Sequence, residues 1–383
     1  MKRLRIGVLF GGRSTEHEVS ILSARSIIAA MNPERFDPVP LYIDKTGRWL
    51  VGGSLKRLLG EDATRTYVYL PPDPTQRSLV PARNAHESPS TISGEGRGGG
   101  VPPLDVVFPV FHGLNGEDGT IQGVLELANL PYVGAGVLGS ALGLDKIYMK
   151  RAFAAAGLPI VDYLPITRRQ YEQDPNAFIA LVEERLGYPC FSKFANSGSS
   201  VGTTKAHDRA ELVAGLHLAS SFDRKLLVER AVDARELEVS VLGNDEPQAS
   251  VVGEVVPAHE FYDYDAKYLD EGSRLIIPAA IDPGVAEDVR AMAVRAFQAV
   301  DAAGMARVDF FLERTSGRVL LNEVNTIPGF TRISMYPKLW EASGLSYPKL
   351  IERLVDLAIE RFNDKQRSQT AIDSKLLDSG TNE

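Results

Sequence analysis

The chain has 383 residues, a length typical of two or three domains that each bury a hydrophobic core. With 44% hydrophobic and 24% charged residues it has the composition of a globular protein, and no apolar run approaches the roughly 20 residues of a membrane span. The formal net charge of −8 disfavours a nucleic-acid or anionic-membrane surface. The single cysteine, Cys190, excludes an internal disulfide and fits the reducing cytoplasm.

Residues 1–144 have the pattern of an open α/β domain made mostly of parallel strands. Strands are expected near residues 4–10, 39–43 and 106–111, with helical stretches between them. The segment from about residue 71 to 103 is rich in Pro, Ser, Gly and Arg, which predicts a long surface insertion without chemistry of its own.

The first strand runs into GGRSTEHEVS, where a helix is expected to begin near Thr15 and where Thr15 with Glu18 forms a capping-box pattern. A strand, turn and helix of this kind can hold a nucleotide, but the GxGxxG glycines are absent, so a dinucleotide site is weakly supported. Glu16 lies in the first helical turn, where the helix dipole favours an acid whether or not a ligand binds.

The pattern changes near residue 145, and two smaller domains are expected at 145–236 and 237–363. Asp145 can cap a helix that ends at Gly157, and strands are expected around 188–193 and at KLLVER. The last residues, 364–383, are polar and aperiodic, which predicts a disordered tail.

The turn NSGSSVG, residues 196–202, is a candidate for phosphate contact. Its glycines let backbone N–H groups approach phosphate oxygens, Ser199 and Ser200 add hydroxyl donors, and the preceding Lys193 supplies positive charge. An ordinary hairpin turn has the same composition, and the P-loop pattern is absent. Lys146 lies in a separate element, so the convergence of Lys146 and Lys193 on one nucleotide is a hypothesis.

Two further segments allow a functional and a structural interpretation. Carboxylates at Glu229 and Glu236 can accept hydrogen bonds from an adenine amino group and ribose hydroxyls, but exposed charges that bound a strand look the same. The aromatic-rich stretch at 258–274 fits a lid that brings Lys267 and Tyr268 over a site, and equally a small apolar cluster.

Two apolar stretches near the C-terminus, GMARVDFFL and VLLNEVNTIPGF, carry polar groups at alternating positions. Arg307 and Asp309 share one face of the first expected strand, and Glu323 and Asn325 share one face of the second. A three-residue hairpin loop at 315–317, with the glycine left-handed, places Asp309 opposite Glu323 and Arg307 opposite Asn325.

Directly opposed acids destabilise a sheet unless positive charge lies between them, and oxygen ligands of this kind suit a hard cation such as magnesium. The stretch NTIPGFTRIS follows at once. Pro328 and Gly329 fix a turn whose amide can stabilise an oxyanion, and Ser334 can hold a carboxylate. The acidic hairpin and this turn are the strongest functional signal in the chain.

From about residue 4 to 362 the chain resembles the bacterial D-alanine:D-alanine ligases of the ATP-grasp superfamily. The resemblance is carried, in the order of the family, by GGRSTEHEVS, FHGLNGEDGTIQG, YVGAGVLGSALGLDK, GSSVG, EFYDYDAKY, ARVDFF and NEVNTIPGFTRIS. It implies a three-domain ATP-grasp fold, with ATP between the central and C-terminal domains, and a cytoplasmic, homodimeric enzyme that acts on small molecules.

The resemblance also implies roles for individual residues. The nucleotide-binding residues it implies are Lys146, Lys193, Ser200, Glu229, Glu236 and Lys267. Those implied for two magnesium ions, which manganese can replace, are Asp309, Glu323 and Asn325. Glu16, with Ser199 and Tyr268, is expected at the first D-alanine. Arg307 and the Gly329 amide are expected at the oxyanion, and Ser334 at the second D-alanine carboxylate.

The implied reaction forms an acyl phosphate from D-alanine and ATP, which the amine of a second D-alanine attacks to give the dipeptide used in peptidoglycan. The sequence departs from the family at Phe194, where a proline is usual, and in its longer insertion. Other ATP-grasp carboxylate–amine ligases, including D-alanyl-D-lactate ligases, are the nearest alternatives. Tyr268 favours the dipeptide. A nucleotide-binding regulator without catalysis and a dinucleotide oxidoreductase are the more distant ones.

Overall fold

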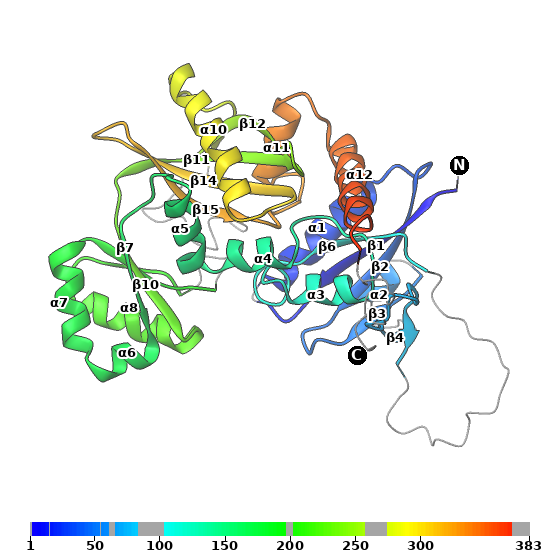
Figure 1. Cartoon of the computed structure of the whole chain (residues 1–383), viewed down its shortest axis with the longest axis horizontal. Helices are drawn as coiled ribbons and strands as arrows, with labels where there is room; N and C mark the ends of the chain where they lie inside the picture. The colour runs from blue at the N-terminus through cyan, green and yellow to red at the C-terminus, as the bar shows by residue number, and fades with distance from the viewer. Residues whose placement is uncertain are drawn as a thin grey trace, which may run out of the picture.

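The computed structural model describes residues 2–14, 16–53, 55–60, 66–82, 103–196, 202–256 and 274–369. They form three β-sheets with helices packed against them, and the first and second sheets lie at opposite ends of the molecule (Figure 1). In the described part of the chain, no helix is both long and apolar enough to cross a membrane.

The first sheet has six strands in the order β5-β4-β3-β2-β1-β6. Its strands are β1 (Leu4–Gly11), β2 (Phe36–Ile43), β3 (Trp49–Val51), β4 (Thr66–Tyr69), β5 (Val80–Pro81) and β6 (Val106–Val110). Its helices are α1 (His17–Ala30), α2 (Leu55–Leu59) and α3 (Thr120–Leu127). The open α/β architecture is confirmed, but the expectation of mostly parallel strands is wrong, because only two of the five strand pairings in this sheet are parallel. Pairing is parallel only between β1 and its neighbours β2 and β6, whereas β3, β4 and β5 extend the sheet by antiparallel pairing.

Helix α1 begins at His17, with Glu16 in the N-cap position. The Thr15 half of the expected capping box lies outside the described residues, and the side chain of Glu18 instead forms an ion pair with Lys45 at 2.9 Å. The part of the expected insertion at 83–102 also lies outside the described residues. The described part of the insertion, before residue 83, contains the short edge strand β5.

Helices α4 (Val137–Leu144) and α5 (Lys146–Ala155) lead from the first sheet to the second. Asp145 caps α5 as expected, because its carboxylate accepts hydrogen bonds from the backbone N–H groups of Ile147 and Tyr148 at 3.1 and 3.2 Å. Gly157 follows the helix with a φ of 68°, the left-handed conformation that ends helices. The cap therefore fixes the position of Lys146, the first residue of α5.

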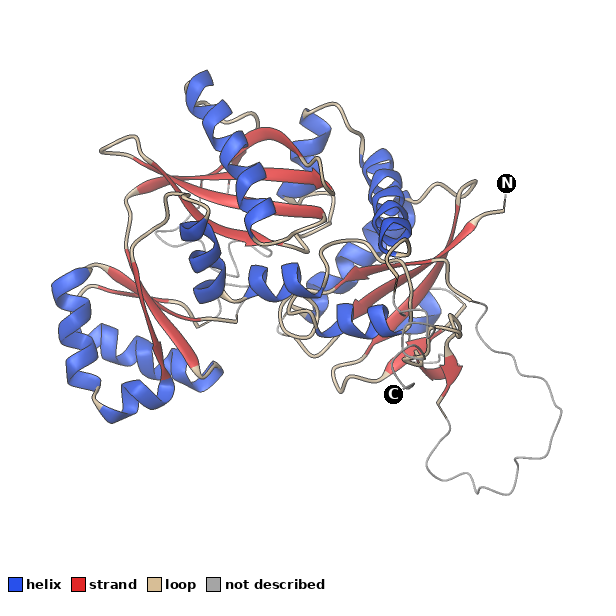
Figure 2. Cartoon of the chain, in the orientation of Figure 1, coloured by secondary structure: helices blue, strands red, loops and turns tan. Residues whose placement is uncertain are grey.

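The second sheet has the order β7-β10-β8-β9, and all its pairings are antiparallel. Its elements are β7 (Tyr163–Thr167), α6 (Arg168–Gln173), α7 (Pro175–Arg185), β8 (Cys190–Phe194), β9 (Thr204–Ala206), α8 (Arg209–Phe222) and β10 (Lys225–Arg230). The helices lie together on one side of this sheet (Figure 2). Cys190 is fully buried in the core beneath them, and burial raises the pKa of its thiol to about 11, which agrees with a packing role.

The third sheet has the order β13-β12-β11-β14-β15. Its elements are β11 (Ala234–Gly243), β12 (Gln248–Val256), β13 (Arg274–Ile276), α10 (Pro283–Ala299), β14 (Gly304–Glu313), β15 (Val319–Asn325), α11 (Met335–Ala342) and α12 (Tyr347–Lys365). Helix α12 extends into the expected tail, of which residues 370–383 lie outside the described part. The helix packs between the first and third sheets (Figure 1), so these two units share one apolar core.

The hairpin of β14 and β15 has the expected pairing, but its loop is longer than expected and one strand contains a bulge. Asp309 lies opposite Glu323 and Arg307 opposite Asn325. The loop is one residue longer than expected, because the backbone N–H of Glu313 bonds to Arg318 O across Arg314 to Gly317. A bulge next to Asp309 compensates for the added residue and restores the register.

Candidate active site

A charged cluster lies on one face of the third sheet and is formed by Glu238, Arg307, Asp309, Glu323 and Asn325, with Lys146 beside them. Arg307 Nε and Nη2 donate to the two carboxylate oxygens of Asp309 at 2.7 and 2.8 Å. The Asn325 amide donates to Asp309 Oδ2 at 3.0 Å. This two-pronged contact fixes the carboxylate plane.

Positive charge does separate the opposed acids, and protein side chains provide it. Lys146 Nζ lies 3.2 Å from Glu323 Oε2, which brings the start of α5 beside β15. Arg307 Nε also lies 3.1 Å from Glu238 Oε2. All these side chains are mostly buried, so their mutual attraction is weakly screened by solvent.

The donor atoms fit a metal ion that arrives with a nucleotide. Among the described residues, no group of three His, Cys, Asp or Glu side chains is arranged to hold a metal. Asp309, Glu323 and Asn325 instead offer two carboxylates and one amide oxygen on neighbouring strands. Magnesium is commonly held by one or two carboxylates together with phosphate oxygens and water. The set therefore suits a metal–nucleotide complex better than a bare cation.

Glu238 was missed from the sequence. It lies directly opposite Asp309 in the pairing of β11 and β14 and is 6% exposed. Its position two residues after Glu236, in the alternating stretch RELEVS, already placed both acids on one face of a strand. The pairing of that strand with β14 joins segments about 70 residues apart, which local pattern does not reveal.

A cavity of about 670 Å³ opens between the second and third sheets, and Lys193, Glu229 and Glu236 all line it. Of the two lysines expected to converge on one nucleotide, Lys193 lines this cavity, whereas Lys146 does not line it and pairs with Glu323 instead, so their convergence stays a prediction. Phe191 and Lys205 contribute further apolar and basic surface. A cavity of this size is within the range of small-molecule sites, roughly 300 to 1,000 Å³.

Beneath this cavity lies a buried triad that the sequence did not indicate. Glu229, 2% exposed, lies between Lys193 Nζ at 2.7 Å and Lys150 Nζ at 3.1 Å. Burial opposes ionisation of Glu229, but the two ammonium groups outweigh it and lower the pKa of Glu229 to about 2. Lys150, 1% exposed, follows Lys146 by one helical turn, and this spacing was the available signal.

Glu16 is 3% exposed and lies against the loop that follows β6. Its backbone N–H donates to Ser14 Oγ at 3.1 Å, and Ser14 Oγ donates to the carbonyl oxygen of His112 at 2.7 Å. A Cβ on Gly113 would lie 3.3 Å from Glu16 Oε2, so only glycine leaves full room for this carboxylate. Glu16, at the N-cap of α1, therefore lies packed against Gly113 and next to Ser14.

Glu117 and His112, which the sequence did not single out, hold the loop after β15. Glu117 accepts hydrogen bonds from the backbone N–H groups of Gly113 at 2.6 Å and Ile327 at 3.1 Å. His112 Nδ1 lies 3.1 Å from Ile327 O. Burial and the nearby Glu16 carboxylate raise the pKa of Glu117 to about 8, and burial lowers the pKa of His112 to about 4.

Ile327 is the midpoint between Asn325 and Gly329, so this contact ties the first sheet to the segment on which both residues lie. Ser334 follows at the N-cap of α11, where its hydroxyl bonds to Thr331 rather than to the helix: Thr331 N–H donates to it at 3.1 Å. Hydrogen bonds thus link Glu16 of the first unit, through Ser14 and His112, to Ile327 in the loop after β15.

Four predicted site residues, Ser199, Ser200, Lys267 and Tyr268, lie outside the described residues. The expected phosphate turn and the expected lid remain predictions for that reason. The described part places Glu16, Arg307, Asp309, Glu323 and Asn325, with Lys146, near the junction of the three sheets, and Lys193, Glu229 and Glu236 in the adjoining cavity.

Two family models match the chain. The model described as the D-ala D-ala ligase N-terminus matches residues 5–135, and the one described as the D-ala D-ala ligase C-terminus matches residues 152–356. Among curated proteins, a D-alanine--D-alanine ligase of Heliobacterium modesticaldum is 52% identical, over 97% of this chain and 98% of its own. One from Acetivibrio thermocellus is 47% identical, over 94% and 97%.

Solved structures give the same result. The D-alanine-D-alanine ligase of Coxiella burnetii has a TM-score of 0.79 at 33% identity and covers 96% of this chain and 97% of its own. The VanG D-Ala:D-Ser ligase of Enterococcus faecalis has a TM-score of 0.81 at 34% identity and covers 93% and 100%. The ATP-grasp fold expected from the sequence is thereby confirmed.

Proposed function

The chain belongs to the D-alanine–D-alanine ligase family, and we propose that it joins two D-alanine molecules to give D-alanyl-D-alanine for peptidoglycan, with conversion of ATP to ADP and phosphate. The observation that carries the proposal is the charged cluster. Asp309, Glu323 and Asn325 offer oxygen ligands beside Lys146 and Arg307, and a cavity large enough for a nucleotide lies between the second and third sheets.

Nucleotide binding is assigned to residues that line or flank this cavity. These are Lys146, Lys193, Ser200, Glu229, Glu236 and Lys267, of which Lys193, Glu229 and Glu236 line it directly. We place two magnesium ions, which manganese can replace, at Asp309, Glu323 and Asn325. Metal ions held there would offset negative charge on the phosphate oxygens. Glu229 keeps the buried partner Lys150 when Lys193 turns towards phosphate, because both lysines contact it.

In the first step a carboxylate oxygen of one D-alanine attacks the γ-phosphorus of ATP. The bond from the γ-phosphorus to the β,γ-bridging oxygen breaks, so ADP leaves and an acyl phosphate forms. Glu16 is proposed to bind the ammonium of this D-alanine, with Ser199 and Tyr268 hydrogen-bonded to it. The contacts of Ser14 support this role, since they hold the backbone of Glu16 next to the loop after β6.

In the second step the neutral amine of the other D-alanine attacks the acyl carbon. The tetrahedral oxyanion accepts hydrogen bonds from Arg307 and the Gly329 amide. It collapses with loss of phosphate and of the amine proton, which leaves the amide bond. Ser334 is proposed to hold the carboxylate of the second D-alanine. Glu117 and His112 support this step by fixing Ile327, two residues from Gly329.

An amino-acid specificity assay tests the proposal. The protein is incubated with ATP, magnesium and D-alanine, and released phosphate and product mass are measured. L-alanine alone serves as a control, and D-lactate or D-serine is added beside D-alanine. Phosphate release with D-alanine alone, with a product of dipeptide mass, is expected. Absence of phosphate release with D-alanine rejects the proposal, whereas preference for a D-serine or D-lactate product keeps the ligase chemistry and changes the second substrate.

The similarity to a D-Ala:D-Ser ligase makes this last arm informative. It covers the chain as fully as the similarity to D-alanine-D-alanine ligases, so overall fold does not separate the two products. Tyr268 is the residue whose identity favours the dipeptide. The mass of the product distinguishes D-alanyl-D-alanine from D-alanyl-D-serine directly.

We also propose a homodimer in the cytoplasm with domain limits at 1–144, 145–236 and 237–363. The three sheets support the division, because the first two each lie within one of these ranges and the third lies within the last one except for residues 234–236 at the start of β11. A single buried cysteine agrees with a reducing compartment. A solution mass near twice 41.7 kDa by light scattering is expected, and a mass near 41.7 kDa contradicts the dimer.

A further inference from the structure

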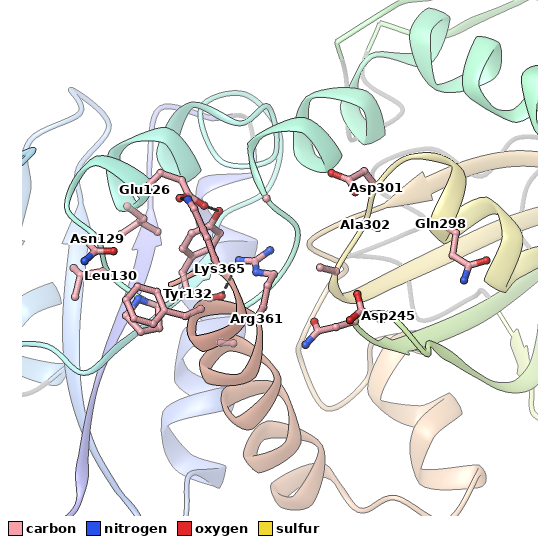
Figure 3. A pocket seen from close by; sticks show the side chains of 17 residues that line it. Glu126, Asn129, Leu130, Tyr132, Asp245, Gln298, Asp301, Ala302, Arg361 and Lys365 are labelled. Atoms are coloured by element: carbon pink, nitrogen blue, oxygen red, sulfur yellow. Dashed lines mark hydrogen bonds and ion pairs between the residues drawn. The ribbon is translucent and has the colours of Figure 1, made fainter. Parts of the chain in front are cut away.

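A cavity of about 520 Å³ lies at the junction of the first and third sheets, and no residue of the charged cluster lines it (Figure 3). Its walls come from the end of α3 and the segment after it, the last turns of α12, the turn between β11 and β12, and the residues that join α10 to β14. Its volume is within the range of small-molecule sites, roughly 300 to 1,000 Å³.

One side of the cavity is basic and held in place. The Arg361 guanidinium lies over the ring of Tyr132 at 4.5 Å, and its Nη2 donates to Tyr132 O at 3.3 Å. The Tyr132 hydroxyl donates to Glu126 at 2.7 Å, and Glu126 is also paired with Lys365. This guanidinium is stacked on the Tyr132 ring and hydrogen-bonded to Tyr132, so it is held in place, and its remaining N–H groups are left for a carboxylate.

The opposite side is acidic. Asp245 and Asp301 are exposed, and neither side chain forms a hydrogen bond or ion pair within the part of the chain that the structure describes. Next to them, the Asn244 amide nitrogen donates to Leu357 O and to Glu360, each at 3.1 Å. Its oxygen Oδ1 is buried and lacks a partner among the same residues, which is costly unless a donor arrives.

Figure 3 shows Arg361 on one side of the cavity, and Asp245 and Asp301 on the other. A ligand that satisfies both sides carries an anionic group at one end and a cationic donor at the other. A short zwitterion, such as an α-amino acid or a dipeptide, has this arrangement. A purely anionic ligand is repelled by the two carboxylates, and a purely cationic ligand is repelled by the guanidinium.

The walls of the cavity connect to the active site through a closely packed junction. A Cβ on Gly304 would lie 3.1 Å from the backbone nitrogen of Gly134, and one on Gly139 would collide with the carbonyl oxygen of Asp301. Asp301 precedes β14, the strand that carries Arg307. A ligand that contacts Asp301 therefore acts on the connection between the first sheet and that strand.

We propose that this cavity is a second binding site for a short zwitterion, whose carboxylate pairs with Arg361 and whose ammonium meets Asp245 and Asp301, and that its occupancy adjusts the ligation rate. The binding part stands on the cavity alone. The regulatory part rests on the proposed ligase function.

Binding is tested on the full chain with its alanine methyl groups labelled with carbon-13, because Ala302 and Ala358 line the cavity and report on it locally. D-alanine and D-alanyl-D-alanine are titrated in separate arms, without ATP, and methyl NMR shifts are recorded. At least one probe is expected to shift both methyl signals in a saturable manner. The arm that does so identifies the ligand as amino acid or dipeptide.

Two variants locate the binding. Arg361→Met keeps the apolar stem but removes the charge, and Asp301→Asn removes one carboxylate at a φ of 56°, which asparagine tolerates. Each is expected to raise the apparent dissociation constant read from the methyl shifts at least about tenfold. This is the effect of losing one charged hydrogen bond of roughly 1.4 kcal/mol or more. Arg367→Met is the matched control, since Arg367 is exposed and does not line the cavity. Thermal melts check that all three fold.

Cavity shifts that are absent with both probes overturn the proposal, as do shifts that are unchanged in both Arg361→Met and Asp301→Asn. Regulation is read from phosphate release at fixed D-alanine, with and without added D-alanyl-D-alanine. Arg361→Met is expected to lose part of the response to the dipeptide while the control Arg367→Met keeps it, and an identical response in the two variants overturns the regulatory part. Failure of the ligase proposal is distinct, because it abolishes phosphate release without affecting the methyl shifts.

Discussion

Glu323 and Asp309 face each other across two strands, and each has a basic partner, Lys146 and Arg307 respectively. Removing either acid leaves a mostly buried positive group without its counter-charge and removes a proposed metal ligand. The acids and bases of the charged cluster are paired, so replacing one residue also changes the electrostatic energy of its partner.

We predict that Glu323→Ala lowers turnover by about 10²-fold or more, because metal stabilisation of phosphate charge contributes several kcal/mol to the barrier. The measurement is phosphate release at saturating D-alanine and ATP. Glu287→Ala, at an exposed position on α10, is the control and is expected to keep the rate of the unmodified protein. An unchanged rate in Glu323→Ala rejects the metal assignment.

Glu117→Gln tests the contact between the first sheet and the loop after β15. In either protonation state the carboxyl group offers acceptor lone pairs to the N–H groups of Gly113 and Ile327, whereas glutamine offers only one oxygen. One buried N–H then lacks a partner, at a cost of about 1–3 kcal/mol. Loss of the hydrogen bond to Ile327 lets the loop after β15 shift, and the proposed Gly329 amide shifts with it.

The expected result for Glu117→Gln is a fall in kcat of about tenfold with little change in KM for ATP, since the nucleotide cavity is not touched. Glu341→Gln, at an exposed position on α11, is the matched control. An increase confined to the KM for ATP, with kcat intact, contradicts the positioning role.

At the scale of elements, the hairpin of β14 and β15 sets the register of the charged cluster. Gly317 has a φ of 70°, and a Cβ there meets nothing within 4 Å. Gly317→Ala therefore costs only the backbone strain, about 1 kcal/mol, without a steric clash. Gly53→Ala, whose Cβ also meets open space but whose φ is not positive, is expected to leave stability unchanged.

Urea unfolding measures both glycine variants. Equal stability of Gly317→Ala and the unmodified protein contradicts a strained glycine at this turn. Its catalytic rate is expected to be retained, because the bulge beside Asp309, and not the turn itself, places the acids opposite each other.

The hairpin also shows what sequence can predict. Alternation and the turn glycine identified the right strands and the pairing of Asp309 with Glu323. They did not reveal the longer loop or the compensating bulge, because both depend on hydrogen bonds such as the one from the N–H of Arg314 to Asp233 O. Glu238, Lys150 and Glu117 were missed for a related reason, since each functions through a distant segment.

At the scale of the whole molecule, helix α12 joins the first and third sheets into one core, whereas the second sheet has a core of its own. Leu354 lies in the shared core and Leu226 in the separate one, and both are fully buried. Truncating either to alanine is expected to cost about 2–5 kcal/mol, the usual range for a buried leucine.

The two leucine variants differ in where this loss appears. In Leu354→Ala, amide hydrogen exchange is expected to quicken in both β1 and β14, because α12 packs on both units. In Leu226→Ala it is expected to quicken mainly in β8 and β10. Faster exchange confined to the first sheet in Leu354→Ala contradicts the shared core.

The sequence predicted three domains, and the described residues form three sheets, but the core shared by the first and third sheets was not predicted. Residues near 347–365 have helical periodicity whether they cover the third sheet, the first or both. Which surfaces they cover depends on long-range packing. Local patterns accordingly predicted the pairing of β14 with β15 better than the contacts between units.

The central claim is ligation through an acyl phosphate, and isotope transfer tests it most directly. D-alanine labelled with oxygen-18 in its carboxylate is incubated with ATP and magnesium, and the phosphate released is analysed by mass spectrometry. Because the attacking carboxylate oxygen stays on phosphorus when the amine displaces phosphate, one labelled oxygen per phosphate formed is predicted. Phosphate that is formed together with the dipeptide but carries no label contradicts the account.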